Sequence, residues 1–391
     1  MQLIEQVFYS PIYERREFKG STTEVNDVIN VGIIGYGMMG KHHASVWSLI
    51  PNVRITAVAE LVPERRDKAA HTYNLSSSEK YSHGVQMLNY ARDLDVVIIA
   101  SQAPEHHQKT LIAVERGCHV VCEKPMALTL EQCDEMVGVA EKKDVVLAIH
   151  HQSIFSRAFA EAKRQIISHE IGELQLLKAY GKGRIACSDL MEIAGHLVHG
   201  MRHLAGSEVT ELYGDVTVQG RSIGKSDRTY IKTLYPEGRD SGYGAGDRIL
   251  GFYKFANGMR AELQLTTLEG SPATFNEQRN FGYYIDVFGS KKRLQIYLPK
   301  TLLVNASPLD DHAKNGTPWE ESYPEFSEDK DLVLTRHFAE DVIKAIREKR
   351  DPIVSGKDGR MAMEMTLGLY ASHFAGRPLS VPLLDRAHPF D

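Results

Sequence analysis

Residues 31–40 of this 391-residue chain read Val31-Gly32-Ile33-Ile34-Gly35-Tyr36-Gly37-Met38-Met39-Gly40, and Glu60 follows about 20 residues later. An apolar run enters a G-x-G-x-x-G turn, so the pattern predicts a strand, a tight turn and a helix. Gly35 allows the sharp turn, Gly37 lets a phosphate approach the backbone, and Gly40 lets the helix pack on the strand. A second apolar strand then ends at the carboxylate of Glu60.

This turn predicts a dinucleotide site. Backbone N–H groups at the start of the helix carry partial positive charge, which suits a pyrophosphate. A glycine-rich turn that binds nothing is the alternative, but the strand, the helix and the acid all stand at the expected places. The expected cofactor contacts here are Gly35, Tyr36, Gly37, Met38, Met39, Gly40 and Glu60.

Glu60 also bears on which dinucleotide binds. A carboxylate at the tip of the second strand accepts hydrogen bonds from a ribose diol and repels a 2′-phosphate, which favours NAD over NADP. Arg65 and Arg66 lie just beyond and could hold such a phosphate, although a solvated first helical turn explains them better.

The composition is that of a globular protein with two domains. Hydrophobic residues make up 42% and charged residues 25% of the chain. The net charge of −5 and the dispersed basic residues predict no nucleic-acid partner. No apolar run could span a bilayer and charges interrupt the first residues, so neither a membrane partner nor a secretory signal is expected. The four cysteines show no framework spacing, which predicts reduced thiols in a cytoplasmic protein.

Strands and helices alternate in the first part of the chain, after an extension over residues 1–28. Apolar runs predict strands at 53–60, 95–100, 119–122 and 145–149, and helices at 63–73, 105–116 and 129–142. This alternation implies a doubly wound parallel sheet with right-handed crossovers. We therefore expect a dinucleotide-binding domain over residues 29–150.

The pattern changes after about residue 150. Helices are expected at 155–168 and 189–205, and strands at 173–180, 209–218, 230–235, 248–255, 259–267, 283–288 and 293–298. Successive strands without intervening helices predict a large, mostly antiparallel sheet with helices on one face. Residues 305–330 resemble a loop, and helices at 331–348 and 358–374 are expected to pack back toward the first domain. Residues 151–391 thus form an α+β domain in this prediction.

Glu123-Lys124-Pro125 follows the strand at 119–122 and lies at the carboxyl edge of the predicted sheet, where ligands bind in open α/β folds. A lysine there can hydrogen-bond a substrate hydroxyl and the cofactor ribose, and burial beside a cationic nicotinamide can lower its pKa. A strand-end lysine in solvent is the alternative on chemistry alone.

Together these motifs resemble the Gfo/Idh/MocA oxidoreductase family over about residues 30–385. The matching residues are Gly35, Gly37, Gly40, Glu60, Ala103-Pro104-Glu105-His106-His107, Cys122-Glu123-Lys124-Pro125, Ile171-Gly172-Glu173, Tyr370-Ala371-Ser372 and Pro378-Leu379-Ser380-Val381-Pro382-Leu383. The resemblance implies an N-terminal Rossmann domain and a C-terminal domain whose open sheet forms homodimer or homotetramer contacts. It also implies chemistry on sugars, inositols or related polyols.

The family's catalytic signature is D-x-G-x-H on a helix of the second domain, with a glycine ten residues after the histidine. Here Glu192 takes the place of the Asp, Ala194 that of the Gly, and His196 that of the His, with Gly206 at the expected distance. On one continuous helix, Glu192, His196, His199 and His203 would share a face. Such a face is open to three interpretations: a structural polar stripe, a divalent metal site or acid–base catalysis. We expect acid–base work by His196 and no metal.

The remaining expected contacts follow the same edge of the sheet. The predicted cofactor contacts in this region are Ser101, Gln102, Ala103, His107, Glu123, Lys124 and Pro125. The predicted substrate contacts are His151, Gln152, Lys182, Arg184 and His199, of which Lys182 and Arg184 could equally belong to a solvated turn.

The expected reaction is hydride transfer between a nicotinamide and a secondary alcohol. His196 takes the hydroxyl proton, Lys124 stabilises the charge that develops on the oxygen, and Glu192 orients the imidazole. Two alternatives remain: an enzyme that retains NAD and cleaves a glycosidic bond through transient oxidation, and a dinucleotide-binding protein without catalysis.

Overall fold

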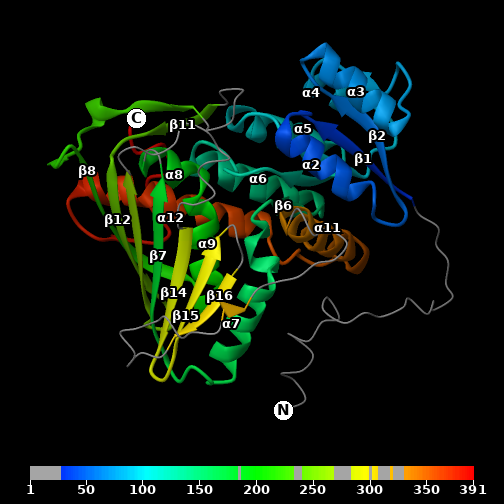
Figure 1. Cartoon of the computed structure of the whole chain (residues 1–391). Helices are drawn as coiled ribbons and strands as arrows, with labels where there is room; N and C mark the ends of the chain where they lie inside the picture. The colour runs from blue at the N-terminus through cyan, green and yellow to red at the C-terminus, as the bar shows by residue number, and fades with distance from the viewer. Residues whose placement is uncertain are drawn as a thin grey trace.

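Two large β-sheets with helices packed on them form most of the described chain in this computed structural model (Figure 1). The structure describes residues 28–183, 186–232, 240–267, 283–298, 302–306, 318–319 and 330–391. The expected extension 1–28, apart from its last residue, and most of the expected loop 305–330 lie outside these ranges. None of the helices in the described ranges is long and apolar enough to cross a bilayer.

The first sheet has six parallel strands in the order β3-β2-β1-β4-β5-β6. Its strands are β1 (Ile29–Ile34), β2 (Val53–Ala59), β3 (Lys80–Tyr81), β4 (Val96–Ile99), β5 (His119–Cys122) and β6 (Leu147–Ile149). Its helices are α2 (Met38–Trp47), α3 (Pro63–Tyr73), α4 (Gly84–Tyr90), α5 (His106–Glu115) and α6 (Leu130–Lys143). The doubly wound prediction is confirmed, and the strand order reverses between β1 and β4; in open α/β sheets ligands bind beyond the carboxyl ends of the strands at such a point.

Sequence reasoning missed β3 and α4 in this sheet. β3 has two residues and is only half-buried, so it carries no apolar run. α4 has seven residues, which is too short for a clear 3.6-residue period. The central strand β4 is buried along its whole length, as expected of a parallel strand covered on both faces.

The second sheet follows the order β17-β16-β15-β14-β7-β13-β12-β8-β18, with β9 beside β8. Its strands are β7 (Leu174–Gly183), β8 (Val209–Val218), β9 (Arg221–Ser222), β12 (Arg248–Phe255), β13 (Arg260–Thr267), β14 (Tyr283–Gly289), β15 (Arg293–Leu298), β16 (Leu302–Ala306), β17 (Pro318–Trp319) and β18 (Leu379–Ser380). β7 and β13 pair in parallel, whereas the other described pairings are antiparallel. The mostly antiparallel prediction is therefore confirmed, but β16 and β17 occupy part of the stretch expected to be a loop.

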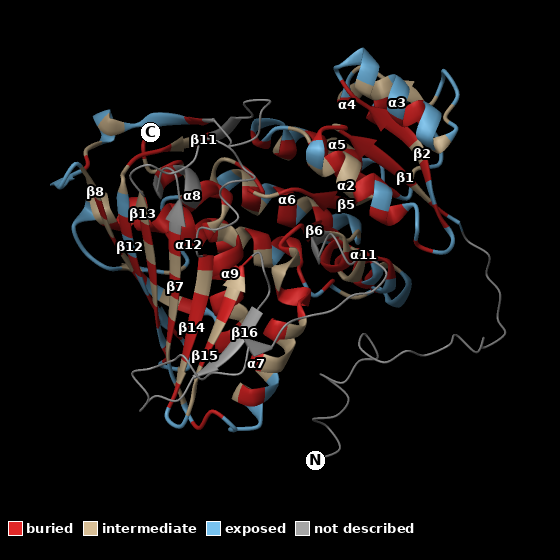
Figure 2. Ribbon diagram, viewed as in Figure 1, coloured by how far each residue is buried: buried red, intermediate tan, exposed pale blue. Residues whose placement is uncertain are grey.

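One face of this second sheet is covered by α7 (Arg157–Ile167), α9 (Ala194–Ala205) and α12 (Gly356–Ala375). Exposed and buried residues alternate strictly along β12, and Figure 2 shows the same banding on the neighbouring strands. A separate ribbon, β10 (Thr229–Lys232) with β11 (Asp240–Gly244), overlaps the strand expected at 230–235, whose last residues lie outside the described ranges.

The C-terminal helices connect the two sheets. α11 (Lys330–Glu348) packs on α2, and α12 packs on α6, on β6 and on β8 (Figure 1). A single hydrophobic cluster accordingly includes Trp47 of α2, Phe159 of α7 and Phe338 of α11. The carboxyl edge of the first sheet is thereby held against helices of the C-terminal part.

Candidate active site

The glycine turn between β1 and α2 leaves no room for a side chain at Gly35 or at Gly40. Gly35 has φ +85°, and a Cβ there would lie 2.6 Å from the carbonyl oxygen of Ala100. A Cβ on Gly40 would lie 1.8 Å from the carbonyl oxygen of Gly35. Gly37 caps α2 without a side-chain acceptor, and the first turn of α2 holds no acidic residue. The helix N–H groups therefore remain available to an anion, which fits the pyrophosphate of a dinucleotide.

Glu60 follows β2 and lies beside this turn. Tyr36 N–H donates to Glu60 Oε2 at 2.6 Å, and Val62 N–H donates to Glu60 Oε1 at 2.9 Å. The Arg66 guanidinium donates to the Glu60 carbonyl at 2.7 Å, so Arg66 ties the start of α3 to the end of β2. A fixed carboxylate here fits a ribose diol and opposes a 2′-phosphate.

Lys124 points from the end of β5 toward the C-terminal part of the chain. Its Nζ donates to the carbonyl of Glu192 at 2.9 Å and lies 3.4 Å from Glu192 Oε2. The Lys124 side chain is only 13% exposed, and Glu192 is buried. The lysine is therefore held between the two parts of the molecule, which does not agree with a strand-end lysine in solvent.

The single helix expected over 189–205 is wrong. α8 (Ala186–Glu192) ends at Glu192, α9 begins at Ala194, and Ile193 between them has φ −111°. The Glu192 carbonyl lies at the C-terminal end of α8, where carbonyls lack partners within the helix. It accepts a hydrogen bond from Lys124 Nζ, which follows strand β5 of the first sheet. Glu192 thus belongs to the preceding helix, and only His196, His199 and His203 share α9.

Three histidines cluster beside Lys124. The ring of His151, which follows β6, lies 5.3 Å from the ring of His196 at 88° and 5.3 Å from the ring of His199 at 24°. His196 Nδ1 lies 3.4 Å from the Ser153 hydroxyl oxygen. Gly195 permits this approach, because a Cβ there would come within 3.0 Å of the His151 ring. The structure therefore brings together three of the predicted site residues from two elements.

These imidazoles are neutral at neutral pH. Burial, then the neighbouring His151 and Lys124, hold the pKa of His196 well below its ordinary value. Burial and then Lys124 lower the pKa of His151 to about 3. Burial and then His151 also hold the pKa of His199 well below its ordinary value. A neutral imidazole can accept a proton from a hydroxyl, which fits a general base.

Several buried polar atoms in this cluster have no partner among the described residues. They are His151 Nδ1, Gln152 Oε1 and both ring nitrogens of His199. Buried polar groups are nearly always hydrogen-bonded in a complete complex. These atoms are therefore suited to the hydroxyl groups of a polar ligand.

Other predicted contacts lie elsewhere. His107 Nε2 lies 2.7 Å from Glu135 on α6, so its cofactor contact stays a prediction. The neighbouring His106, which the prediction omitted, lies buried between the carbonyls of Ser101 at 3.2 Å and Pro125 at 2.9 Å. Ala103 is buried and Gln102 is exposed after β4. Lys182 lies in β7 with its side chain outside the description, and Arg184 lies outside the described residues.

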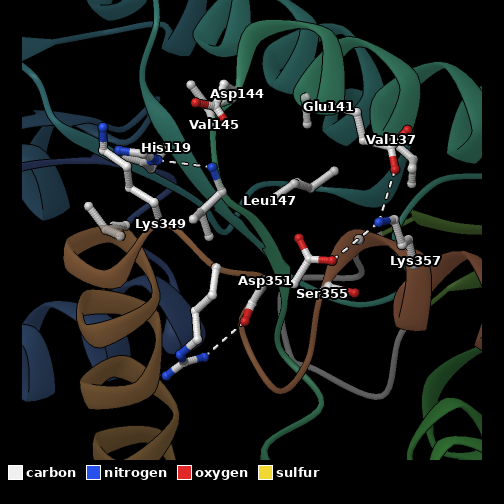
Figure 3. A pocket seen from close by; sticks show the side chains of 15 residues that line it. His119, Val137, Glu141, Asp144, Val145, Leu147, Lys349, Asp351, Ser355 and Lys357 are labelled. Carbon is white, nitrogen blue, oxygen red and sulfur yellow. Dashed lines mark hydrogen bonds and ion pairs between the residues drawn. The ribbon is translucent and has the colours of Figure 1, made fainter.

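A hollow of about 580 Å³ at the opposite edge of the first sheet is not part of this site (Figure 3). His119 and Leu147, which open β5 and β6, line it, whereas Lys124 follows the far end of β5. Lys357 crosses its rim in ion pairs with Glu141 and Asp351 at 3.0 and 3.2 Å.

The buried histidines predict acid sensitivity. In the unfolded chain, His151 takes up a proton as the pH falls below its ordinary pKa. In the folded chain, it stays unprotonated until the pH falls to about 3. The free energy of unfolding therefore falls as pH drops from 7 to 5, by about 2 kcal/mol for this one residue. Urea unfolding should show that His151→Asn shrinks the difference between pH 7 and pH 5, whereas His71→Asn, at an exposed position on α3, leaves it unchanged. An unchanged difference in His151→Asn would contradict the assignment.

The comparisons with known proteins agree with this geometry. The model of an oxidoreductase family with an NAD-binding Rossmann fold matches residues 29–151. An uncharacterised oxidoreductase, YrbE of Bacillus subtilis, is 27% identical over 268 residues, covering 63% of this chain and 78% of its own. A myo-inositol 2-dehydrogenase of Thermotoga maritima is 24% identical over 347 residues, covering 86% and 93%. A solved levoglucosan dehydrogenase complex with NADH and L-sorbose superposes with a TM-score of 0.73 at 21% identity, covering 91% and 99%.

Proposed function

The chain belongs to the Gfo/Idh/MocA family of NAD-binding oxidoreductases, and on that premise we propose that it interconverts a secondary alcohol and a ketone of a sugar, inositol or related polyol. The observation that carries this proposal is the meeting of Lys124 with a cluster of neutral histidines at the carboxyl edge of the NAD-binding sheet. The substrates named for the relatives, myo-inositol and levoglucosan, support a polyhydroxylated ring.

Each residue has a separate role in the proposed chemistry. Bound NAD supplies the nicotinamide carbon that accepts or returns the hydride. His196 accepts the hydroxyl proton, since burial keeps its imidazole unprotonated at neutral pH. Lys124 donates a hydrogen bond to the same oxygen and stabilises its negative charge. Glu192, which contacts Lys124, holds that ammonium group in place, a role different from the orientation of His196 expected from sequence.

The substrate hydroxyls are proposed to bind the unpartnered polar atoms of His151, Gln152 and His199. These atoms come from the segment after β6 and from α9, so they lie on the side of the site formed with the C-terminal part. Lys182 and Arg184 stay predictions. We assign the cofactor to residues 29–150 and the substrate contacts mainly to residues 151–391.

The test is a panel of inositols, free sugars and glycosides incubated with NAD⁺. The proposal predicts NADH formed in proportion to the polyol oxidised. Glycoside cleavage without NADH accumulation would instead support the enzyme that retains its cofactor. Binding of NADH without turnover of any substrate would support a dinucleotide-binding protein.

Glu60 predicts a preference for NAD. We expect NADPH to bind at least about tenfold more weakly than NADH, because the 2′-phosphate would face a fixed carboxylate. Glu60→Gln should narrow that ratio in fluorescence titrations, whereas Glu64→Gln, an exposed acid in the first turn of α3, should not. Equal affinity of the wild type for both cofactors would overturn this prediction.

The face of the second sheet that no described helix covers supports a homodimer or homotetramer. On β12, Leu250 and Phe252 are exposed on this face, at 36% and 44%. Tyr213 of β8 lies 6.3 Å from Phe252, so the aromatic surface continues across strands. Light scattering of the purified protein tests the assembly, and a monomer at all concentrations would exclude it.

The four cysteines are free and buried, which supports a cytoplasmic location.

A further inference from the structure

A buried carboxylate lies directly beside Lys124. Glu123 Oε1 accepts from His43 Nε2 of α2 at 3.0 Å and from His150 Nδ1 at 2.9 Å. Glu123 Oε2 accepts the backbone N–H of Lys124 at 3.2 Å. Burial alone would raise the pKa of Glu123, but His150 and His43 outweigh that effect and hold it well below its ordinary value. The carboxylate is therefore ionised and can only accept hydrogen bonds.

A second layer fixes His150. His150 Nε2 lies 3.1 Å from the Thr335 hydroxyl of α11, and that hydroxyl lies 2.7 Å from His42 Nε2 of α2. Phe338, one turn farther along α11, packs edge-on against the His150 ring at 5.0 Å. A continuous chain of hydrogen bonds thus leads from the C-terminal helix α11 to the backbone of Lys124.

The Thr335 hydroxyl completes the hydrogen bonds of the His150 ring. His150 Nδ1 must carry a proton, because it faces an acceptor-only carboxylate. The Nε2 atom of the same ring faces the Thr335 hydroxyl, which can donate to this nitrogen or accept from it. Without that hydroxyl, the buried Nε2 atom loses this partner, and the His150 ring can turn and withdraw Nδ1–H from Glu123. The carboxylate would then turn away and release the Lys124 N–H.

His43, Glu123 and His150 are also residue types that can bind zinc. The ligand atoms of His43, Glu123 and His150 lie within 4.8 Å of one another. However, both imidazole nitrogens are already at hydrogen-bond distance from one carboxylate oxygen. Protons therefore account for the contacts, and metal content becomes an outcome of the test.

We propose that Thr335 and His150 are positioning residues for Lys124, which they orient through the carboxylate of Glu123. The inference rests on the proposed role of Lys124 at the substrate oxygen. Lys124 contacts the substrate in that proposal, whereas Thr335 acts at a distance, from a helix more than 200 residues later in the sequence.

Three substitutions separate the hydroxyl from the shape of the side chain. Thr335→Val removes the hydroxyl and keeps the volume, and Thr335→Ser keeps the hydroxyl. Thr366→Val makes the same change at a buried threonine on α12, whose hydroxyl bonds, among the described residues, to two carbonyls of its own helix at 3.1 and 3.0 Å. With the best substrate of the polyol panel, Thr335→Val should lower kcat at least about tenfold with little change in KM or NADH affinity. Thr335→Ser should restore kcat, and Thr366→Val should leave it unchanged.

A second readout does not need a substrate. The rate at which a small acylating reagent labels each lysine can be followed by mass spectrometry. Lys124 should label several-fold faster in Thr335→Val than in the wild type, because its pairing with Glu192 loosens, and Thr335→Ser should match the wild type. Lys163, which donates to the carbonyls of His203 and Leu204, serves as the internal reference.

Three results would overturn the inference: unchanged labelling of Lys124 in Thr335→Val, equal effects of Thr335→Val and Thr335→Ser, or one zinc ion per chain in the purified protein. If no polyol is oxidised, the dehydrogenase proposal fails, and the labelling rates still decide whether Thr335 positions Lys124.

Discussion

Replacing Lys124 by methionine is expected to lower kcat by at least about 100-fold, since the substrate oxygen loses the charged donor that stabilises its transition state. Methionine keeps most of the apolar stem, so packing at the end of β5 changes little. NADH should still bind, because the glycine turn and Glu60 are untouched. The measurement is steady-state turnover of the best polyol, with NADH affinity from fluorescence titration.

Lys109→Met is the matched control for this change. Lys109 is also buried and paired with an acid, Glu105 at 2.6 Å, but it lies on α5 outside the proposed site. It should cost stability without a comparable loss of kcat. If the Lys124→Met enzyme kept more than about a tenth of wild-type turnover, Lys124 would have no catalytic role.

His196→Asn carries the second large effect, again a loss of at least about 100-fold in kcat. The wild-type base has a pKa well below 6.5, so kcat should stay flat across neutral pH and fall only in acid, where the imidazole becomes protonated. In His196→Asn that acid limb should disappear, because asparagine does not titrate. Profiles of kcat against pH for both enzymes make the comparison.

His203→Asn controls for the loss of an imidazole from the same helix. His203 lies two turns beyond His196 on α9, where its ring meets Phe159 at 6.4 Å. Its replacement should leave the pH profile unchanged. An acid limb that persists in His196→Asn would show that another group is the base, with His151 the nearest candidate.

Local patterns were sufficient to predict the first sheet and its carboxyl edge. The glycine spacing, the apolar runs and Glu60 each depend on residues close together in the sequence, so they can be recognised without the structure. Lys124 could be placed because parallel strands of a doubly wound sheet end at the same edge. β3 and α4 escaped because neither is long enough to show a period.

Long-range contacts decided the features that sequence reasoning missed. α8 ends at Glu192, whose carbonyl accepts a hydrogen bond from Lys124, 68 residues earlier. Thr335 reaches His150 across 185 residues. His106 lies between the carbonyls of Ser101 and Pro125, and residue types alone do not reveal which of the two adjacent histidines takes that place. The Thr335 contact forms only when α11 returns to the first sheet.

The most direct measurement of the central claim follows the hydrogen itself. The best substrate of the panel is prepared with deuterium on its carbinol carbon and incubated with the enzyme and NAD⁺. The account predicts reduced cofactor that carries one deuterium by mass spectrometry, in proportion to the ketone formed, and none from Lys124→Met beyond trace amounts. Reduced cofactor without deuterium, or product formed without reduced cofactor, would contradict it.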